Sequence, residues 1–262
     1  MAEENQKNTS QSLKDRPPNG QCSRCSKGIE PFLRPALLGM SARWFSPNSL
    51  CNDCTEEIKS REKVLHEQKR LDEAFRHSRL SLRFRQRTFE NFIPEPKTQI
   101  AYDIAVKFLP GIRGLLFSGP CGVGKTHLAA AIANKQIGKT PILFISCPEF
   151  LFEIREKING RGAGNKFPLF EMARTVDLLI LDDIGAEKPS EWVQETLFIL
   201  VNYRYEQMLP TIFTSNCGLD ELEERIGKRI VSRMVEMCRC ISMDGEDWRL
   251  KQRRQMMERH NG

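Results

Sequence analysis

A glycine-rich loop carries the residue types that bind the phosphates of a nucleoside triphosphate. Residues 119–126, GPCGVGKT, fit the GxxxxGK[ST] phosphate-loop pattern. Glycines let backbone N–H groups curl around a phosphate, and we expect Lys125 to reach the β- and γ-phosphates and Thr126 to bind Mg²⁺. The residues expected to bind the nucleotide are Gly119, Pro120, Cys121, Gly122, Val123, Gly124, Lys125, Thr126, His127 and Asp182.

Two apolar runs further along the chain end in polar side chains of the same chemistry. The run LLIL ends in Asp182, which can hold Mg²⁺ through water, and Asp183, which lies where a catalytic base would be. Asn216 follows the run TIFTS and can orient an attacking water. An Asn after a strand is also a common turn residue. Only its order after the other two motifs makes Asn216 a candidate.

Three arginines near the C-terminus are candidates for contacts with the γ-phosphate. Arg229 and Arg233 are four residues apart, so they share one face of a helix. An arginine that reaches the nucleotide of a neighbouring subunit is an arginine finger; a salt-bridged surface pair is the alternative. Arg249 follows the last apolar run and can contact phosphates bound to its own subunit.

Four cysteines form a metal-binding pattern near the N-terminus. Cys22, Cys25, Cys51 and Cys54 give CxxC–x25–CxxC, and two such pairs supply the four thiolates that tetrahedral Zn²⁺ prefers. An iron–sulfur site or a redox dithiol remains the alternative. The segment is short and poor in apolar residues, so bound metal would supply its stability. Cysteines 121, 147, 217, 238 and 240 are instead expected as small apolar residues.

The nucleotide motifs lie in a segment that alternates strands and helices. Strands are expected at 114–118, 141–147, 177–182, 211–215 and 238–243, with helices at 126–135, 148–158, 190–207 and 220–237. This alternation predicts a five-stranded parallel sheet covered by helices on both faces. We divide the chain into a disordered tail (1–20), a zinc-binding domain (21–55), a basic helical linker (56–92) and an ATPase domain (93–262).

Composition indicates a cytoplasmic protein with a basic segment. The 262 residues carry a formal net charge of +6, and we find no apolar run long enough to span a membrane. No signal peptide is evident, so we expect a reducing compartment. Between residues 59 and 87, ten Lys or Arg face four acidic residues. This surplus fits a polyanion or an acidic partner, or simply a solvated helix face.

Taken together, residues 84–249 resemble the bacterial helicase-loader ATPases of the DnaC/DnaI type, which are AAA+ proteins of the additional-strand P-loop (ASCE) class. The segments RQRTFENF (85–92) and DLLILDDIGAEKPSEW (177–192) carry the resemblance most specifically. It implies that Asn216 is sensor 1, Arg249 is sensor 2, and Arg233, with Arg229 as second choice, is the arginine finger. Most AAA+ proteins carry Glu where Asp183 stands. Loaders commonly have Asp, which is one methylene shorter and compatible with slow turnover.

The same resemblance implies partners. Loaders of this type assemble side by side as ATP-bound homo-oligomers, grip single-stranded DNA, and open a hexameric, DnaB-like replicative helicase. DNA contacts are expected from Arg155, Lys157, Arg161 and Lys166, although these residues also fit an ordinary surface loop. Helper ATPases of the IstB type share the core and serve a transposase on duplex DNA. A third interpretation is a non-hydrolytic zinc-containing adaptor for which ATP is only a switch.

Overall fold

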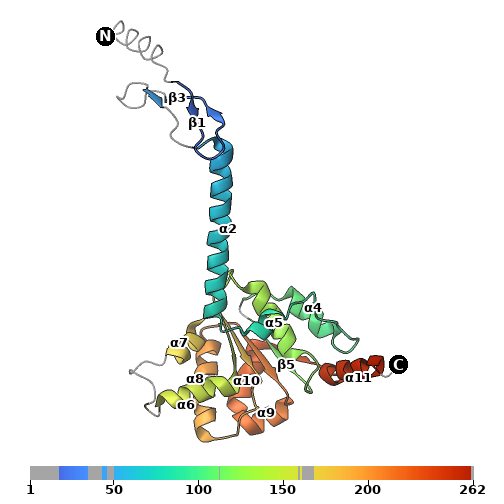
Figure 1. The fold of residues 1–262 in the computed structure, drawn as a ribbon. Helices are drawn as coiled ribbons and strands as arrows, with labels where there is room; N and C mark the ends of the chain where they lie inside the picture. Colours follow the sequence, from blue (N-terminus) through green and yellow to red (C-terminus); the bar gives the residue numbers. More distant parts are fainter. Residues whose placement is uncertain are drawn as a thin grey trace. The chain divides into compact units, whose positions relative to one another are not determined.

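The computed structural model describes residues 18–34, 43–45, 50–111, 113–158, 160 and 168–260 (Figure 1). Contacts divide the chain into two compact units, with the division after Lys69. This division falls inside the segment 56–92, which the sequence marked as a basic helical linker. Among the described helices, none has the length and apolar character needed to cross a membrane.

Among the described residues of the N-terminal unit, the buried cluster consists of cysteines. Its antiparallel strand pairs are β1 (Gly20–Gln21) with β2 (Gly28–Ile29) and β3 (Phe32–Arg34) with β4 (Arg43–Phe45). Cys22, Cys51 and Cys54 are buried against Ile29 and Leu50. Helix α2 (Asn52–His77) begins beside this cluster and continues into the second unit.

The second unit has the predicted five-stranded parallel sheet. Its strands are β5 (Gly114–Ser118), β6 (Ile142–Ser146), β7 (Leu178–Asp182), β8 (Thr211–Ser215) and β9 (Cys238–Ser242). They lie in the order β6-β7-β8-β5-β9, and the neighbouring pairs are parallel. Ser118 pairs with Ser215, and Ser146 pairs with Asp182, so the carboxyl ends of the strands meet at one edge. The predicted fold class is confirmed.

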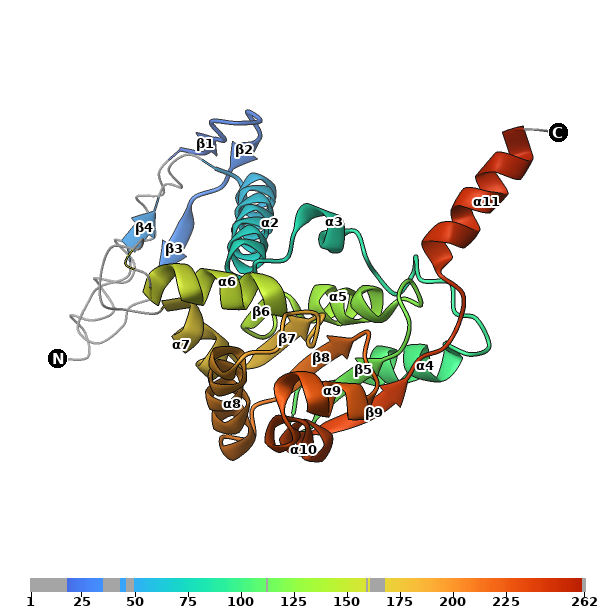
Figure 2. The ribbon, with the colours of Figure 1, turned by 90° about the horizontal axis from the view of Figure 1, so that it is seen from below.

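Helices cover both faces of this sheet (Figure 2). Helices α4 (Gln99–Lys107) and α5 (Lys125–Gln136) pack on one face. The other face is covered by α6 (Cys147–Ile158), α7 (Pro168–Thr175), α8 (Glu191–Glu206), α9 (Leu219–Ile226) and α10 (Lys228–Met237). The short α3 (Leu82–Arg85) precedes α4, and α11 (Trp248–His260) ends the described chain.

One helix expected from the sequence is two helices. The pattern over 220–237 predicted a single helix, but Gly227 separates α9 from α10 with φ +99°. This backbone conformation is open to glycine and costly for other residues. The break turns α10 onto the same buried core that α9 contacts, through Leu222, Ile226 and Ile230.

Candidate nucleotide-binding site

The loop between β5 and α5 is folded as a phosphate loop. Gly119, Gly122 and Gly124 all have positive φ values, of +141°, +81° and +100°. A Cβ atom on Gly119 would lie 1.9 Å from the carbonyl oxygen of Met243, so only glycine fits where this loop passes the end of β9. Because α5 begins at Lys125, the positive end of the helix faces the loop.

Lys125 is fixed at the mouth of the loop by three acceptors. Its Nζ donates hydrogen bonds of 2.7 Å to the carbonyl oxygens of Gly119 and Pro120 and to Oδ1 of Asn216. Burial lowers the pKa of this ammonium group from its ordinary value. The predicted phosphate-binding lysine and the predicted sensor 1 amide are therefore in direct contact.

The two acidic residues at the end of β7, Asp182 and Asp183, occupy different environments. Asp182 is 7% exposed, and burial raises its pKa even though the Thr126 and Thr214 hydroxyls donate hydrogen bonds to it. Asp183 has φ +59°, and its backbone N–H donates to Thr214 Oγ1 at 2.8 Å. Asn216 Nδ2 donates to Asp183 Oδ1. Asp182 and Thr126 thus meet where both could hold Mg²⁺. Asp183 is instead linked to Lys125 by hydrogen bonds through the Asn216 amide.

These side chains line a cavity of ≈ 530 Å³ at the carboxyl edge of the sheet. Its volume is in the range of small-molecule sites. The phosphate loop, Asp182, Asp183, Asn216 and Arg249 line one part of it. The other part is formed by the connector that precedes α4, and its lining residues include Arg83, Phe84, Arg87, Asn91, Phe92 and Ile93. Sequence reasoning did not assign this wall, although RQRTFENF marked the same segment as distinctive.

His127 lines the cavity and binds the connector that precedes α4. Its Nε2 lies 2.9 Å from the carbonyl oxygen of Thr88, so the Nε2–H tautomer donates this hydrogen bond. The Phe92 ring packs edge-on to His127 with centroids 5.1 Å apart, and it stacks on Tyr102. Burial lowers the pKa of His127. On the same helix, Asn134 donates to the carbonyl oxygens of Phe84 and Arg87.

The three candidate arginines are in two different places. Arg249 lines the cavity of its own chain, and the adjacent Trp248 N–H donates to the carbonyl oxygen of Gly122 at 3.2 Å. Arg229 is exposed on α10. Arg233 donates to Asn202 Oδ1 at 2.7 Å and lies over the Phe198 ring. Neither α10 arginine is among the described residues that line the cavity.

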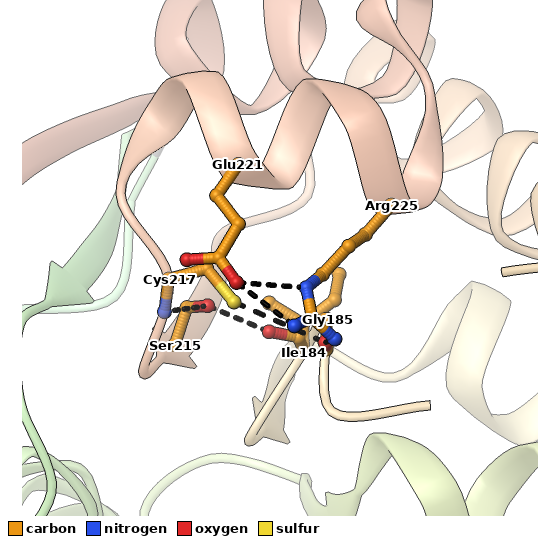
Figure 3. A network of polar contacts seen from close by, with 6 residues as sticks. All are labelled: Ile184, Gly185, Ser215, Cys217, Glu221 and Arg225. Carbon is orange, nitrogen blue, oxygen red and sulfur yellow. Dashed lines mark hydrogen bonds and ion pairs between the residues drawn. The ribbon is translucent and has the colours of Figure 1, made fainter. Parts of the chain in front are cut away.

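A second network holds the turn that follows Asp183 (Figure 3). Ser215 Oγ donates to the carbonyl oxygen of Ile184 at 2.7 Å and accepts from the Cys217 N–H at 3.1 Å. From α9, Arg225 Nη1 donates to the carbonyl oxygen of Gly185 at 3.0 Å. The end of β8 and helix α9 therefore both bind this turn.

The four predicted metal ligands are together in the N-terminal unit. The sulfur atoms of Cys22, Cys25, Cys51 and Cys54 all lie within 4.8 Å of one another, and those of Cys25 and Cys51 are 3.6 Å apart. Sulfurs around tetrahedral Zn²⁺, at Zn–S distances of about 2.3 Å, are separated by roughly 3.8 Å. Backbone N–H groups, chiefly that of Cys51, lower the pKa of Cys22 to about 6, whereas the Cys51 and Cys25 thiols raise the pKa of Cys54 to about 12. The donor set and its spacing therefore fit zinc.

The predicted DNA-contacting residues are only partly described. Arg155 is exposed at the end of α6, with its guanidinium 4.5 Å from the centre of the Trp192 ring. Lys157 is half-buried on the last turn of the same helix. Arg161 and Lys166 lie outside the described residues.

The strand order, the phosphate loop after β5 and the acidic pair at the end of β7 define a P-loop ATP-binding protein with the AAA+ fold. The sequence profile of the IstB-like ATP binding protein family matches residues 34–256, and the chain belongs to this family.

Related proteins support the resemblance to helicase loaders. The chain is 34% identical over 151 residues to the replicative helicase loader DnaI of Bacillus subtilis (strain 168), which covers 52% of this chain and 48% of DnaI. It is 29% identical over 154 residues to the replicative helicase loader DnaC of Escherichia coli (strain K12), covering 56% of this chain and 62% of DnaC. A crystal structure of the DnaC helicase loader superposes with a TM-score of 0.55 at 27% identity, covering 63% of this chain and 100% of that one. The matched region is about half to three-fifths of the two curated relatives.

Proposed function

We propose that this protein is an ATP-dependent loader of a hexameric replicative helicase. The observation that carries the proposal is the cavity in which Lys125, the Thr126–Asp182 pair and the Asp183–Asn216 pair meet. This arrangement has a group for each task in ATP hydrolysis. The similarity to proteins named replicative helicase loaders supplies the cellular role.

In this proposal the phosphate loop and Lys125 bind the phosphates of ATP. Thr126 and Asp182 hold Mg²⁺, directly or through water, and the ion neutralises charge on the β- and γ-phosphate oxygens. Asp183 accepts a proton from the attacking water, which the Asn216 amide orients. The Asn216 contact with both Lys125 and Asp183 supports this division of roles. The short reach of Asp183 favours slow hydrolysis that DNA or the helicase stimulates.

ATP binding would assemble copies of the chain head to tail. Arg249 would act on the nucleotide of its own subunit, since it lines that cavity. Arg233, with Arg229 as second choice, would act on the nucleotide of the next subunit. Their position on α10, outside their own cavity, supports this assignment.

The four-cysteine cluster would bind a structural zinc ion. Four thiolates leave no open coordination position, so the zinc would stabilise a docking module rather than catalyse a reaction. The spacing of the four sulfur atoms supports this role. The helicase is the proposed partner of the module.

Single-stranded DNA would bind in the ATP-bound assembly. Arg155 and Lys157, with Arg161 and Lys166 in the adjoining segment, remain the proposed contacts. The exposure of Arg155 on α6 supports its availability to phosphates. Binding through such contacts weakens steeply as salt rises.

A second candidate function is a transposition helper ATPase, which the match to the IstB-like family favours. Such a helper would act on duplex DNA with a transposase. The non-hydrolytic adaptor is less well supported, because the cavity holds the full set Lys125, Asp182 and Asn216.

Steady-state ATP hydrolysis separates these functions. We would measure it for the purified protein and for Lys125→Ala, with and without single-stranded DNA and a hexameric replicative helicase. A loader shows turnover that depends on Lys125 and changes with DNA or helicase. Turnover that responds only to duplex DNA with a transposase supports the helper function. Hydrolysis unchanged by Lys125→Ala, with no helicase binding, contradicts the loader proposal.

A further inference from the structure

Helix α9 contacts the turn after Asp183 at two points. The Leu222 side chain packs on Gly185 so closely that a Cβ atom there would lie 2.7 Å from Leu222 Cδ2. One turn further along α9, Arg225 Nη1 donates a 3.0 Å hydrogen bond to the carbonyl oxygen of the same glycine (Figure 3). Helix α9 is therefore held to this turn by an apolar contact and by a hydrogen bond.

The other side of the turn is fixed to the sheet. Thr214 Oγ1 accepts the backbone N–H of Asp183 at 2.8 Å, and Ser215 Oγ donates to the carbonyl oxygen of Ile184. Asp183 itself has φ +59°, a conformation that is costly for a residue with a side chain. Residues held in such conformations need support from their surroundings. Thr214 on β8 supports Asp183 directly, and the contacts from α9 hold the same turn at Gly185.

Helix α9 also connects this turn to α10. The two helices are joined at Gly227, and their buried side chains belong to one apolar core, which includes Leu222, Ile226, Ile230 and Val231. Helix α10 carries Arg229 and Arg233. Movement of α10 against a neighbouring molecule would therefore be passed through α9 toward Gly185.

We propose that Arg225 is a positioning residue that sets the placement of Asp183 and couples it to α10. The inference rests on the proposed function, in which Asp183 is the base and α10 faces the next subunit. Engagement of α10 with the neighbouring nucleotide would adjust Asp183 in the same chain, so successive sites of the assembly would hydrolyse ATP cooperatively.

The surroundings of Arg225 separate this role from simple stabilisation. Its side chain is 38% exposed, so shortening it opens no buried cavity. Glu221 holds the guanidinium with contacts of 3.0 Å to Nε and 2.8 Å to Nη2. Exposed ion pairs of this kind contribute little to stability. The contact that matters for Asp183 is the hydrogen bond to Gly185.

Three substitutions test the proposal in the full-length protein. For Arg225→Ala we expect kcat for ATP to fall between about tenfold and 10²-fold, the cost of a small misplacement of a catalytic group. Nucleotide affinity, measured with a fluorescent ATP analogue, and the thermal midpoint stay close to wild type. Arg225→Lys keeps a donor for Gly185 and restores part of the rate. Glu221→Gln removes the ion pair but leaves that donor, so its kcat stays near wild type.

Hydrogen–deuterium exchange provides a readout that does not depend on activity. Arg225→Ala should speed exchange at residues 183–187 and leave β7 protected. A wild-type kcat and unchanged exchange in Arg225→Ala overturn the inference, as does a parallel loss of rate, nucleotide affinity and thermal midpoint that Arg225→Lys fails to restore. If the wild-type protein lacks Lys125-dependent hydrolysis, the proposed function has failed instead, and the exchange result still reports whether Arg225 holds the turn.

Discussion

At the scale of single residues, the adjacent carboxylates Asp182 and Asp183 in the nucleotide site have different surroundings. Asp182 is buried and hydrogen-bonded by two hydroxyls, while Asp183 is bonded to the Asn216 amide at the cavity. We expect Asp183→Asn to lower kcat by about 10²-fold or more, the usual contribution of a general base. ATP affinity should change little, because Lys125 and the phosphate loop are untouched. Single-turnover hydrolysis with parallel binding measurements checks this. Equal loss of binding and rate would place Asp183 among the binding groups instead.

Through His127, the free energy of unfolding should depend on pH. Burial lowers its folded-state pKa below the unfolded value of about 6.5. Between those two values the unfolded chain binds more protons, so the free energy of unfolding falls as pH drops below about 6.5. A glutamine at this position can still donate to the Thr88 carbonyl oxygen but does not titrate. Urea denaturation at pH 7 and pH 5 should therefore show that wild type exceeds His127→Gln in free energy of unfolding by less at pH 5 than at pH 7. A gap that stays constant or widens contradicts this.

At the scale of elements, a buried arginine ties three segments together. Arg204 on α8 is 1% exposed, and burial lowers its pKa to about 9. It donates to Thr211 Oγ1 and to the carbonyl oxygens of Ala173, Arg174, Val176 and Pro210. These acceptors belong to the end of α7, to the turns that lead into β7 and β8, and to the first residue of β8. Without the guanidinium each of these acceptors would lose a buried donor, although the carbonyl oxygen of Pro210 would keep the Leu179 N–H at 3.4 Å.

Replacing this side chain should therefore be costly. For Arg204→Met we expect a loss of about 3 kcal/mol or more in the free energy of unfolding, because each unpaired buried acceptor costs about 1–3 kcal/mol. The exposed Arg239 on β9 is a matched control, and Arg239→Met should stay within about 0.5 kcal/mol of wild type. Equilibrium urea unfolding measures both. Equal stability of the two variants would show that water replaces the lost donors.

The sequence predicts the elements better than the contacts between them. The strands end within one residue of the expected positions because apolar runs of β length leave little choice. The phosphate loop follows from its glycines and Lys125. The break at Gly227 was missed, since apolar spacing continues across it. The cavity wall around Phe92 and the Arg225–Gly185 contact were missed as well. Both contacts join segments far apart in the chain. The pattern RQRTFENF marks the segment around Phe92 but does not show what that segment contacts.

At the scale of the whole molecule, each chain of the proposed assembly supplies Arg233 to the next chain, and its own cavity receives Arg233 from another chain. Arg233→Ala keeps an intact cavity but cannot complete the site of its neighbour. Lys125→Ala cannot hold the phosphates but still presents Arg233. Each variant alone should be nearly inactive. An equal mixture should recover at most about a quarter of wild-type hydrolysis, because one in four random head-to-tail interfaces joins a competent cavity to a competent arginine.

The matched control uses the arginine inside the cavity. Arg249 lines the nucleotide site of its own chain, so a mixture of Arg249→Ala and Lys125→Ala contains no complete site and should stay inactive. Hydrolysis at several protein concentrations measures both mixtures. Recovery only when Arg229→Ala replaces Arg233→Ala in the mixture would move the finger to Arg229. If neither the Arg233→Ala mixture nor the Arg229→Ala mixture recovers hydrolysis, the sites act independently and the proposed head-to-tail assembly is wrong.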